Sequence, residues 1–284
     1  MSEPMRRPKG STNAELPGRR STVNGHRSAL FLLLTAACGV TPLTNKIDVG
    51  TDAFVIGVGE ASDGMTDLFA SSAAGGTVSR VTFNRLQEQM PRLSGSGTMV
   101  VFLRSSPVET TEPEPEIVVL NLQSMGERGA RLPREAGSAL AVAWLPGDSA
   151  IAIRTDGAIW SLPAPPGSSD FSRLTGADSA RADSSLAVLL GDPPRAVVVD
   201  CPSGSGVCVR AASGETSTLD SAATAPLRWG ADSIAYSKSG TVTVRPLAGG
   251  RPRTPPWSAA PSAFRDLAYH PGAPNSTAPR SPRP

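Results

Sequence analysis

Short apolar runs separated by turn residues recur along the chain after residue 45, whereas helical periodicity is scarce. Four segments line up on one pattern of strand, turn and strand: 91–103, 143–162, 186–199 and 227–247. Their equivalent strands carry Met99, Ile151, Val197 and Ile234, and they recur roughly every 40 to 50 residues, a period typical of β-propellers. The pattern therefore predicts an array of small antiparallel sheets.

One such sheet cannot bury both of its faces, so the units are expected to pack face to face around a central axis. Three further strands are predicted at Phe54–Val58, Asp67–Ser71 and Val78–Thr82, and a last one at Phe264–Tyr269. We expect the last strand to complete the first blade, so that both ends of the chain close the ring. The predicted fold is an all-β propeller of five four-stranded blades, with six blades as the alternative.

The predicted domain boundaries follow from composition. Residues 1–37 are expected to be a basic n-region and a signal peptide, and residues 38–45 a short tether. The propeller is predicted over 46–271, and the Pro-, Ser- and Arg-rich residues 272–284 are predicted to be a disordered tail.

The one long apolar run of the chain is the nine-residue segment Ala29–Ala37, preceded by Arg27. Because a bilayer-spanning helix needs about 20 residues, this run predicts a secretory signal and not a span. The small residues before Cys38 resemble the lipobox of bacterial lipoproteins, in which the cysteine thiol takes a diacylglyceryl group. That resemblance implies lipidation of Cys38, and an ordinary signal peptide with an incidental cysteine is the alternative. Met1, Met5 and Val23 are all possible starts of translation.

The formal net charge of +2 is too small to indicate nucleic-acid binding. The chain has only two histidines, which disfavours histidine-ligated metal sites and a Ser-His-Asp arrangement. The sequence contains neither a phosphate-binding loop nor a nucleophile elbow. We therefore predict no catalytic residue, no metal and no cofactor, and we interpret His270 as a turn residue.

Cys201 and Cys208 flank a turn between two strand-like runs, 196–200 and 207–210. Paired strands would bring the two Cβ atoms within disulfide reach, and export would place them in an oxidising compartment. We predict a disulfide, worth roughly 2 kcal/mol on the loop-entropy model, with free thiols as the alternative.

Two groups of acidic residues are candidate functional sites. Glu60, Asp63 and Asp67 offer oxygen ligands of the kind Ca²⁺ prefers, although a solvated hairpin is the simpler interpretation. The second group lies in a Pro-rich stretch that is either a partner-contact loop or a solvated insertion. Its members are Glu109, Glu112, Glu114 and Glu116.

The four tryptophans are candidates for ligand stacking. Trp144 and Trp229 occupy repeat-equivalent positions, which indicates packing between blades, and Trp160 lies in a predicted strand. The role of Trp257, which follows two prolines, is left open.

The repeats also resemble those of a known family. Trp144–Ile153 and Asp156–Trp160 are similar to a repeat that reads aromatic-Ser-Pro-Asp-Gly-x-x-Ile-Ala-Phe and then Asp-Gly-x-Ile-aromatic. Asp67-Leu68-Phe69 and Arg80-Val81-Thr82 resemble the strands that follow in such repeats. The resemblance is to the propeller domain of TolB and related exported proteins, and it covers about residues 50–270.

The resemblance implies a protein-binding or scaffold role in the periplasm or at the outer membrane. The expected function is a cell-envelope lipoprotein that binds envelope proteins of unknown identity and is held to the membrane through a lipid on Cys38. No nucleic acid is expected as a partner. Gly39 after the cysteine favours the outer membrane if the cell has two membranes. The alternatives are a propeller hydrolase or lyase with carboxylates at the channel mouth, and a sensor of a small ligand or glycan.

Overall fold

The computed structural model describes residues 43, 47–61, 64–107, 115–166, 170–190, 193–199, 201–258, 260–261 and 263–273. All of them belong to one compact unit that spans residues 39–284. The signal segment, Cys38, and most of the predicted tether and tail lie outside the described residues, as do Asp63, Glu109, Glu112 and Glu114.

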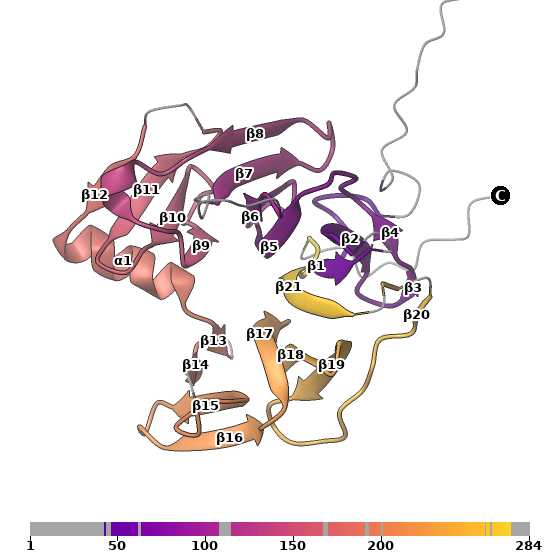
Figure 1. Ribbon diagram of the computed structural model, residues 1–284. Helices are drawn as coiled ribbons and strands as arrows, with labels where there is room; N and C mark the ends of the chain where they lie inside the picture. Colours follow the sequence, from indigo (N-terminus) through magenta and orange to yellow (C-terminus); the bar gives the residue numbers. More distant parts are fainter. Residues whose placement is uncertain are drawn as a thin grey trace, which may run out of the picture. The chain divides into compact units, whose positions relative to one another are not determined.

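The first blade joins the two ends of the described chain, as the sequence predicts (Figure 1). The C-terminal strand pairs antiparallel with the N-terminal one, from Phe54 opposite His270 to Gly59 opposite Phe264. The order of its strands from the inside outwards is β21 (Phe264–His270), β1 (Phe54–Glu60), β2 (Thr66–Ser72) and β4 (Ser79–Arg80).

Blades 2 and 3 are regular four-stranded antiparallel sheets. A short 3₁₀ helix, η1 (Arg134–Ala136), lies in the connection between them. Blade 2 contains β5 (Gln87–Leu93), β6 (Met99–Ser105), β7 (Glu116–Asn121) and β8 (Glu127–Ala130), and blade 3 contains β9 (Ala141–Trp144), β10 (Ala150–Arg154), β11 (Ile159–Pro163) and β12 (Ser172–Leu174).

Blades 4 and 5 complete a ring of five blades, so the fold is the predicted five-bladed propeller and not the six-bladed alternative. Met99, Ile151, Val197 and Ile234 all lie in second strands, which confirms the predicted equivalence. Blade 4 contains β13 (Leu189–Leu190), β14 (Ala196–Val199), β15 (Val207–Ala211) and β16 (Thr216–Asp220), and blade 5 contains β17 (Ala223–Trp229), β18 (Ser233–Lys238) and β19 (Thr241–Pro246).

Blade 5 departs from the prediction because its sheet has three strands. In place of a fourth strand, Arg253 forms a single bridge with Val244. Prolines at 252, 255 and 256 have no N–H to donate to a longer ladder. The chain then forms β20 (Trp257–Ser258), which pairs parallel with β3 (Gly76–Thr77) at the outer side of blade 1.

The helix α1 (Gly176–Leu186) was not expected from the sequence. Its residues are mostly Ala, Ser and Asp, and only Ala182 among them is buried, so it carries no stripe of large apolar side chains. The helix packs on β9, β10 and β11 of blade 3, where Ala182 meets Ala152 and Ile159. It occupies a place where the next blade of a regular propeller would pack.

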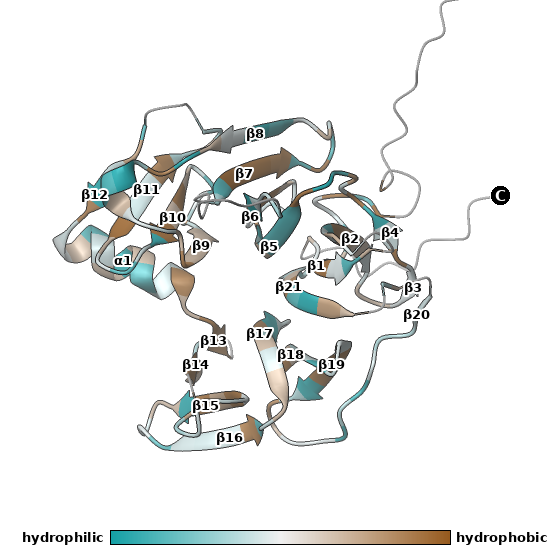
Figure 2. Cartoon of the chain, viewed as in Figure 1, coloured by the Kyte–Doolittle hydropathy of each residue, from teal (hydrophilic) through white to brown (hydrophobic). Residues whose placement is uncertain are grey.

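The core consists of apolar clusters between neighbouring blades. Separate clusters join blades 1 and 2, blades 2 and 3, blades 5 and 1, and blades 4 and 5. Figure 2 shows the buried strand β7 in brown and the polar inner strand β5 in teal. Among the described residues no apolar cluster joins blade 3 to blade 4, because α1 covers the face of blade 3 instead.

Candidate functional site

One end of the propeller gathers the turns that follow the second strands and the connections between blades. In an antiparallel sheet of four strands, the second and fourth strands finish where the first one starts. This end, called here the connector end, therefore includes the described parts of the turns after β1, β6 and β14 together with α1. Function in propellers is commonly carried by such loops.

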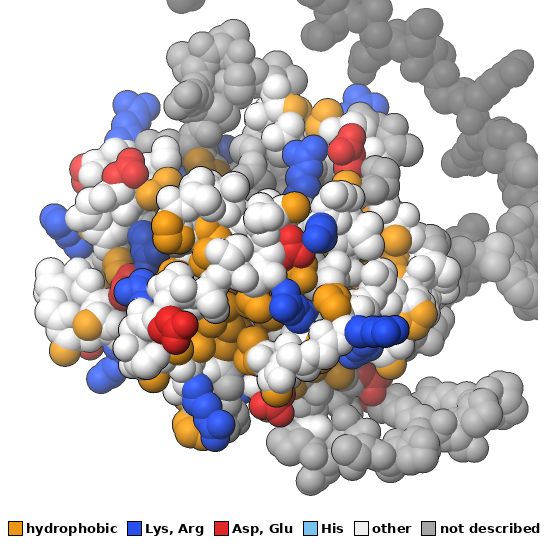
Figure 3. All heavy atoms as spheres, turned by 90° about the horizontal axis from the view of Figure 1, so that it is seen from below, with side chains coloured by type: hydrophobic (Ala, Val, Ile, Leu, Met, Phe, Trp, Pro, Cys, Tyr) orange, Lys and Arg blue, Asp and Glu red, His pale blue; other side chains and the backbone are white. Residues whose placement is uncertain are grey.

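On the face shown in Figure 3, charged side chains do not form a patch of a single sign. Figure 3 shows one face on which hydrophobic side chains gather near the centre, with Lys, Arg, Asp and Glu side chains dispersed around them. This dispersion agrees with the small net charge of +2. It gives no support to a nucleic-acid interface.

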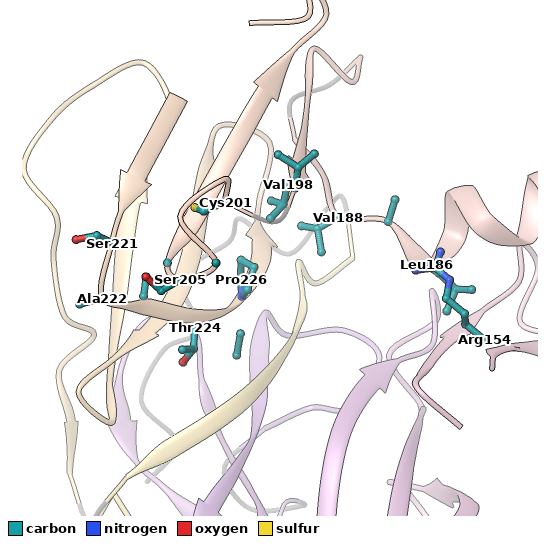
Figure 4. Close-up of a pocket in the computed structure, with 16 residues that line it drawn as sticks. Arg154, Leu186, Val188, Val198, Cys201, Ser205, Ser221, Ala222, Thr224 and Pro226 are labelled. Atoms are coloured by element: carbon teal, nitrogen blue, oxygen red, sulfur yellow. The ribbon is translucent and has the colours of Figure 1, made fainter. Parts of the chain in front are cut away.

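An open cavity of about 910 Å³ lies at the connector end, between the end of α1, blade 4 and the start of blade 5 (Figure 4). Arg154 and Leu186 lie on one side of it and Ser221 and Ala222 on the other. The lining residues are Arg154, Leu186, Ala187, Val188, Val198, Val199, Cys201, Gly204, Ser205, Gly206, Ser221, Ala222, Ala223, Thr224, Ala225 and Pro226.

The cavity exists because blade 4 is incompletely packed. Its inner strand β13 has two residues, whereas β5, β17 and β21 have seven each. None of the four residues of β14 is buried, although second strands are largely buried in the other blades. In the sequence this region is the repeat segment 186–199, and its pattern of strand, turn and strand does not indicate a cavity.

The disulfide between Cys201 and Cys208 is confirmed, with Cα atoms 5.1 Å apart. It ties the end of the cavity-lining loop to β15, where Cys208 is fully buried. Gly206 in this loop has a φ of +91°, and a Cβ there would stand 2.5 Å from the Asp220 carbonyl oxygen. A covalent bond and a glycine together fix one wall of the cavity.

Within the part of the cavity wall that the structure describes, Arg154 is the only residue with a titratable side chain. Its guanidinium pairs with Asp183 of α1, and both side chains are well exposed. An exposed pair of this kind contributes little to stability, so Arg154 is able to exchange its partner at small cost.

A second charged centre lies buried between blades 1 and 2. Asp67 is fully buried and its carboxylate accepts from Arg80, which overturns the expectation of a solvated hairpin at this residue. Glu60, at the other end of the predicted acidic group, forms an exposed ion pair with Arg265. Within the described ranges no three His, Cys, Asp or Glu side chains gather as a metal site.

Glu88 belongs to the same buried centre. Its carboxylate accepts from Arg104 at 2.9 Å, from Asn84 at 2.9 Å and from the Leu68 N–H at 3.0 Å. Burial raises the pKa of Glu88, while the hydrogen bonds from Thr82, Asn84 and Arg104 act in the opposite direction. Because Leu68 belongs to blade 1 and Arg104 to blade 2, the Glu88 carboxylate links these two blades by hydrogen bonds.

The tryptophans pack between blades, as predicted for Trp144 and Trp229. Trp144 is buried and donates through Nε1 to the Arg92 carbonyl at 2.9 Å. Trp229 stacks on Tyr269 at 4.7 Å between ring centroids. The role of Trp257 was left open by the sequence. Its ring packs against Phe264 and its Nε1 donates to the Ser72 carbonyl, and both residues belong to blade 1. Trp257 therefore holds the segment that follows blade 5 against blade 1.

The remaining predicted residues contribute little to a described site. Glu116 is the first residue of β7 and is half-buried, and its carboxylate lies over Gly129. His270 is buried at the end of β21, where Nδ1 accepts from the Gly272 N–H at 3.1 Å. In the part of the chain that the structure covers, no helix is both long and apolar enough to span a bilayer.

No protein-family model matches the chain, and no curated protein matches it. Among solved structures, TolB from Acinetobacter baumannii matches with a TM-score of 0.43 and 15% identity, covering 80% of this chain and 68% of TolB. A nidogen/laminin complex chain matches with a TM-score of 0.46 and 7% identity, over 76% of this chain and 97% of that one. A prolyl endopeptidase matches with a TM-score of 0.31 and 11% identity, over 72% and 36%. TolB is thus among the structures that this propeller resembles, and function must be argued from the site.

Proposed function

We propose that this chain is a cell-envelope lipoprotein whose propeller binds another protein at its connector end. The observation that carries the proposal is the composition of the cavity wall. The sixteen described residues that line the cavity include no Asp, Glu, His, Lys or Tyr. The walls offer aliphatic side chains, hydroxyl groups and backbone amides, which are groups that recognise a partner.

General acid–base catalysis needs a titratable group within hydrogen-bond reach of the substrate. The enzyme alternative would require carboxylates that converge on open space. Asp67 and Glu88 are both fully buried, and their carboxylate oxygens accept hydrogen bonds from protein donors. The cavity wall therefore favours binding over chemistry as the function of this site.

Export is supported by two independent features. The Ala29–Ala37 run has the length of a signal peptide core. The Cys201–Cys208 disulfide is of the kind that persists in oxidising compartments. The proposal adds that Cys38 carries the lipid, and that the anchored protein faces the periplasm, at the outer membrane if the cell has two. A contact loop at Glu109, Glu112 and Glu114 is part of the same proposal.

The test is in-cell crosslinking of the tagged full-length chain, captured from detergent-solubilised envelope and analysed by mass spectrometry. A Cys38→Ser variant removes the lipid acceptor, and a Thr41→Ser variant is the matched control. We expect one or two proteins to be recovered reproducibly with the wild type and the control, and to be lost with Cys38→Ser. A protein that stays soluble whatever stands at position 38, with no enriched partner, would contradict the proposal.

A further inference from the structure

Two inner strands share an irregularity that bears on the cavity. In β5 the register shifts between Gln89 and Arg92, and Met90, which precedes Pro91, has a φ of +51°. In β17 the register shifts in the same way between Thr224 and Leu227, and there Ala225 and Pro226 form the bulge. The φ of Ala225 is +49°. Because the two bulges have the same residue count and first residues of nearly equal φ, we expect their N–H groups to leave the sheet in equivalent directions.

In blade 2 this N–H has a partner. Met90 donates to Oδ2 of Asp266 at 3.1 Å, and Asp266 lies on β21, the inner strand of the preceding blade. An acidic side chain on a neighbouring extended strand is therefore what completes the bulge of β5. The contact between Met90 and Asp266 therefore shows which kind of group a bulge of this geometry binds.

In blade 5 the equivalent bulge opens onto the cavity, which Ala225 and Pro226 help to line. The preceding inner strand is β13, which is only two residues long and is preceded by Val188. Among the described residues, none that lines the cavity is acidic, and none accepts a hydrogen bond from the Ala225 N–H through its side chain.

We infer that the cavity receives an extended segment of a partner protein, and that an Asp or Glu side chain of this segment accepts from the Ala225 N–H as Asp266 does from Met90. This inference rests on the proposed function and names the chemistry of the partner. Leu186, Val188 and Val198 offer contacts for aliphatic side chains beside the acidic one. Arg154 is the one charged residue among the described residues of the cavity wall, and as a cation it favours an acidic segment over a basic one.

The size of the cavity agrees with such an occupant. Pockets that enclose drug-sized ligands have volumes of about 300–1,000 Å³, and this cavity has about 910 Å³. It therefore holds a few residues of an extended chain. The disulfide and Gly206 hold its wall in place before binding, which reduces the entropy lost when the segment docks.

The test begins with a phage-displayed library of random heptapeptides selected on the full-length chain in detergent. We expect enrichment of an Asp or Glu flanked by aliphatic residues. The enriched peptide and its Asn or Gln counterpart are then synthesised with a fluorescent label and compared by anisotropy. The acidic peptide should bind at least ten-fold more tightly. Equal affinities, or a library that yields basic or no consensus, would overturn the inference.

Variants locate the site. Val188→Asp places a carboxylate on the cavity wall in the inner-strand segment that precedes blade 5, and it should abolish peptide binding. Arg154→Gln should weaken binding about three- to ten-fold, while Arg251→Gln, at an exposed residue outside the cavity, should leave affinity unchanged. Circular dichroism and thermal melting check that each variant folds, and Arg154→Gln carries the test if Val188→Asp does not. If folded Val188→Asp and Arg154→Gln proteins bound the peptide with wild-type affinity, the peptide would not bind in this cavity.

The same variants separate the two proposals. If Val188→Asp still captures the crosslinked partner in cells, the cavity is not the docking site although the protein remains a binding module. If no partner is captured by any form of the chain, the proposed function itself fails. Loss of the partner with Val188→Asp, but not with Arg251→Gln, supports both.

Discussion

Blades 2 and 4 have the same strand order but differ in how they are held together. Blade 2 contributes side chains to one apolar cluster on each face, and five of the seven residues of β6 are buried. Among its described residues, blade 4 contributes to a cluster with blade 5 only, and none of the residues of β14 is buried. A blade that packs on one side has less apolar burial to stabilise it.

The disulfide lies in the blade that lacks packing. Cys201 and Cys208 close a short loop between β14 and β15, the two central strands of blade 4. On the loop-entropy model such a crosslink acts by restricting the unfolded chain, so it stabilises without needing contacts on the open face. The comparison shows how the fold tolerates the cavity. Blade 4 lacks apolar packing on one face, and its disulfide offsets part of the stability that this packing would contribute.

The largest expected effect is in the well-packed blade. Phe102 of β6 is fully buried, so Phe102→Ala should lower the free energy of unfolding by about 3–5 kcal/mol. Phe83, which is 68% exposed, is the matched control, and Phe83→Ala should change the free energy of unfolding by less than about 0.5 kcal/mol. Urea unfolding followed by tryptophan fluorescence measures both. Similar losses in the two variants would mean that blade 2 is not packed as described.

The disulfide is the next largest contributor. Replacing both Cys201 and Cys208 with Ser should cost about 2–2.5 kcal/mol for a loop of this length. The oxidised wild type and the double variant are compared by the same urea unfolding. A loss below about 0.5 kcal/mol would show that blade 4 does not depend on its crosslink.

Two valines in equivalent second strands compare the blades most directly. Val101 of β6 is fully buried, and Val101→Ala should cost about 2 kcal/mol. Val197 of β14 is only half-buried, and Val197→Ala should cost less than about 1 kcal/mol. If the two losses were equal, β14 would be as well packed as β6 and the proposed contrast would fail.

A smaller effect concerns pH. Burial raises the pKa of Glu88 in the folded protein above 4.5, its ordinary value, so the folded state holds this proton more tightly than the unfolded state. Its contribution to stability is therefore complete below about pH 4.5 and declines as the pH rises towards the folded pKa, by at most about 1.4 kcal/mol per pH unit. Glu88→Gln should remove this decline. Urea unfolding between pH 4 and 7 measures it, and an unchanged slope in the variant would assign the decline to another group.

The repeats made the regular part of the fold predictable. Turns at fixed offsets and apolar second strands located the blades, and the strand at 264–269 indicated how the ring closes. The helix α1 was missed because its alanines and serines carry no apolar periodicity, and helix formation there depends on packing against blade 3. The cavity was missed because it results from a short strand and a displaced neighbour, which no local pattern records. The bulge at Ala225 could not be predicted from the sequence either, because Ala rarely adopts a positive φ.

Hydrogen–deuterium exchange, measured separately for each blade with and without a reductant, shows whether blade 4 is an open blade held by its disulfide. In the oxidised protein, residues 196–220 should exchange faster than residues 99–121. Reduction should then accelerate exchange in blade 4 while leaving blade 2 unchanged. Equal protection of the two blades, or equally accelerated exchange in both after reduction, would mean that blade 4 is not an open blade held by its disulfide.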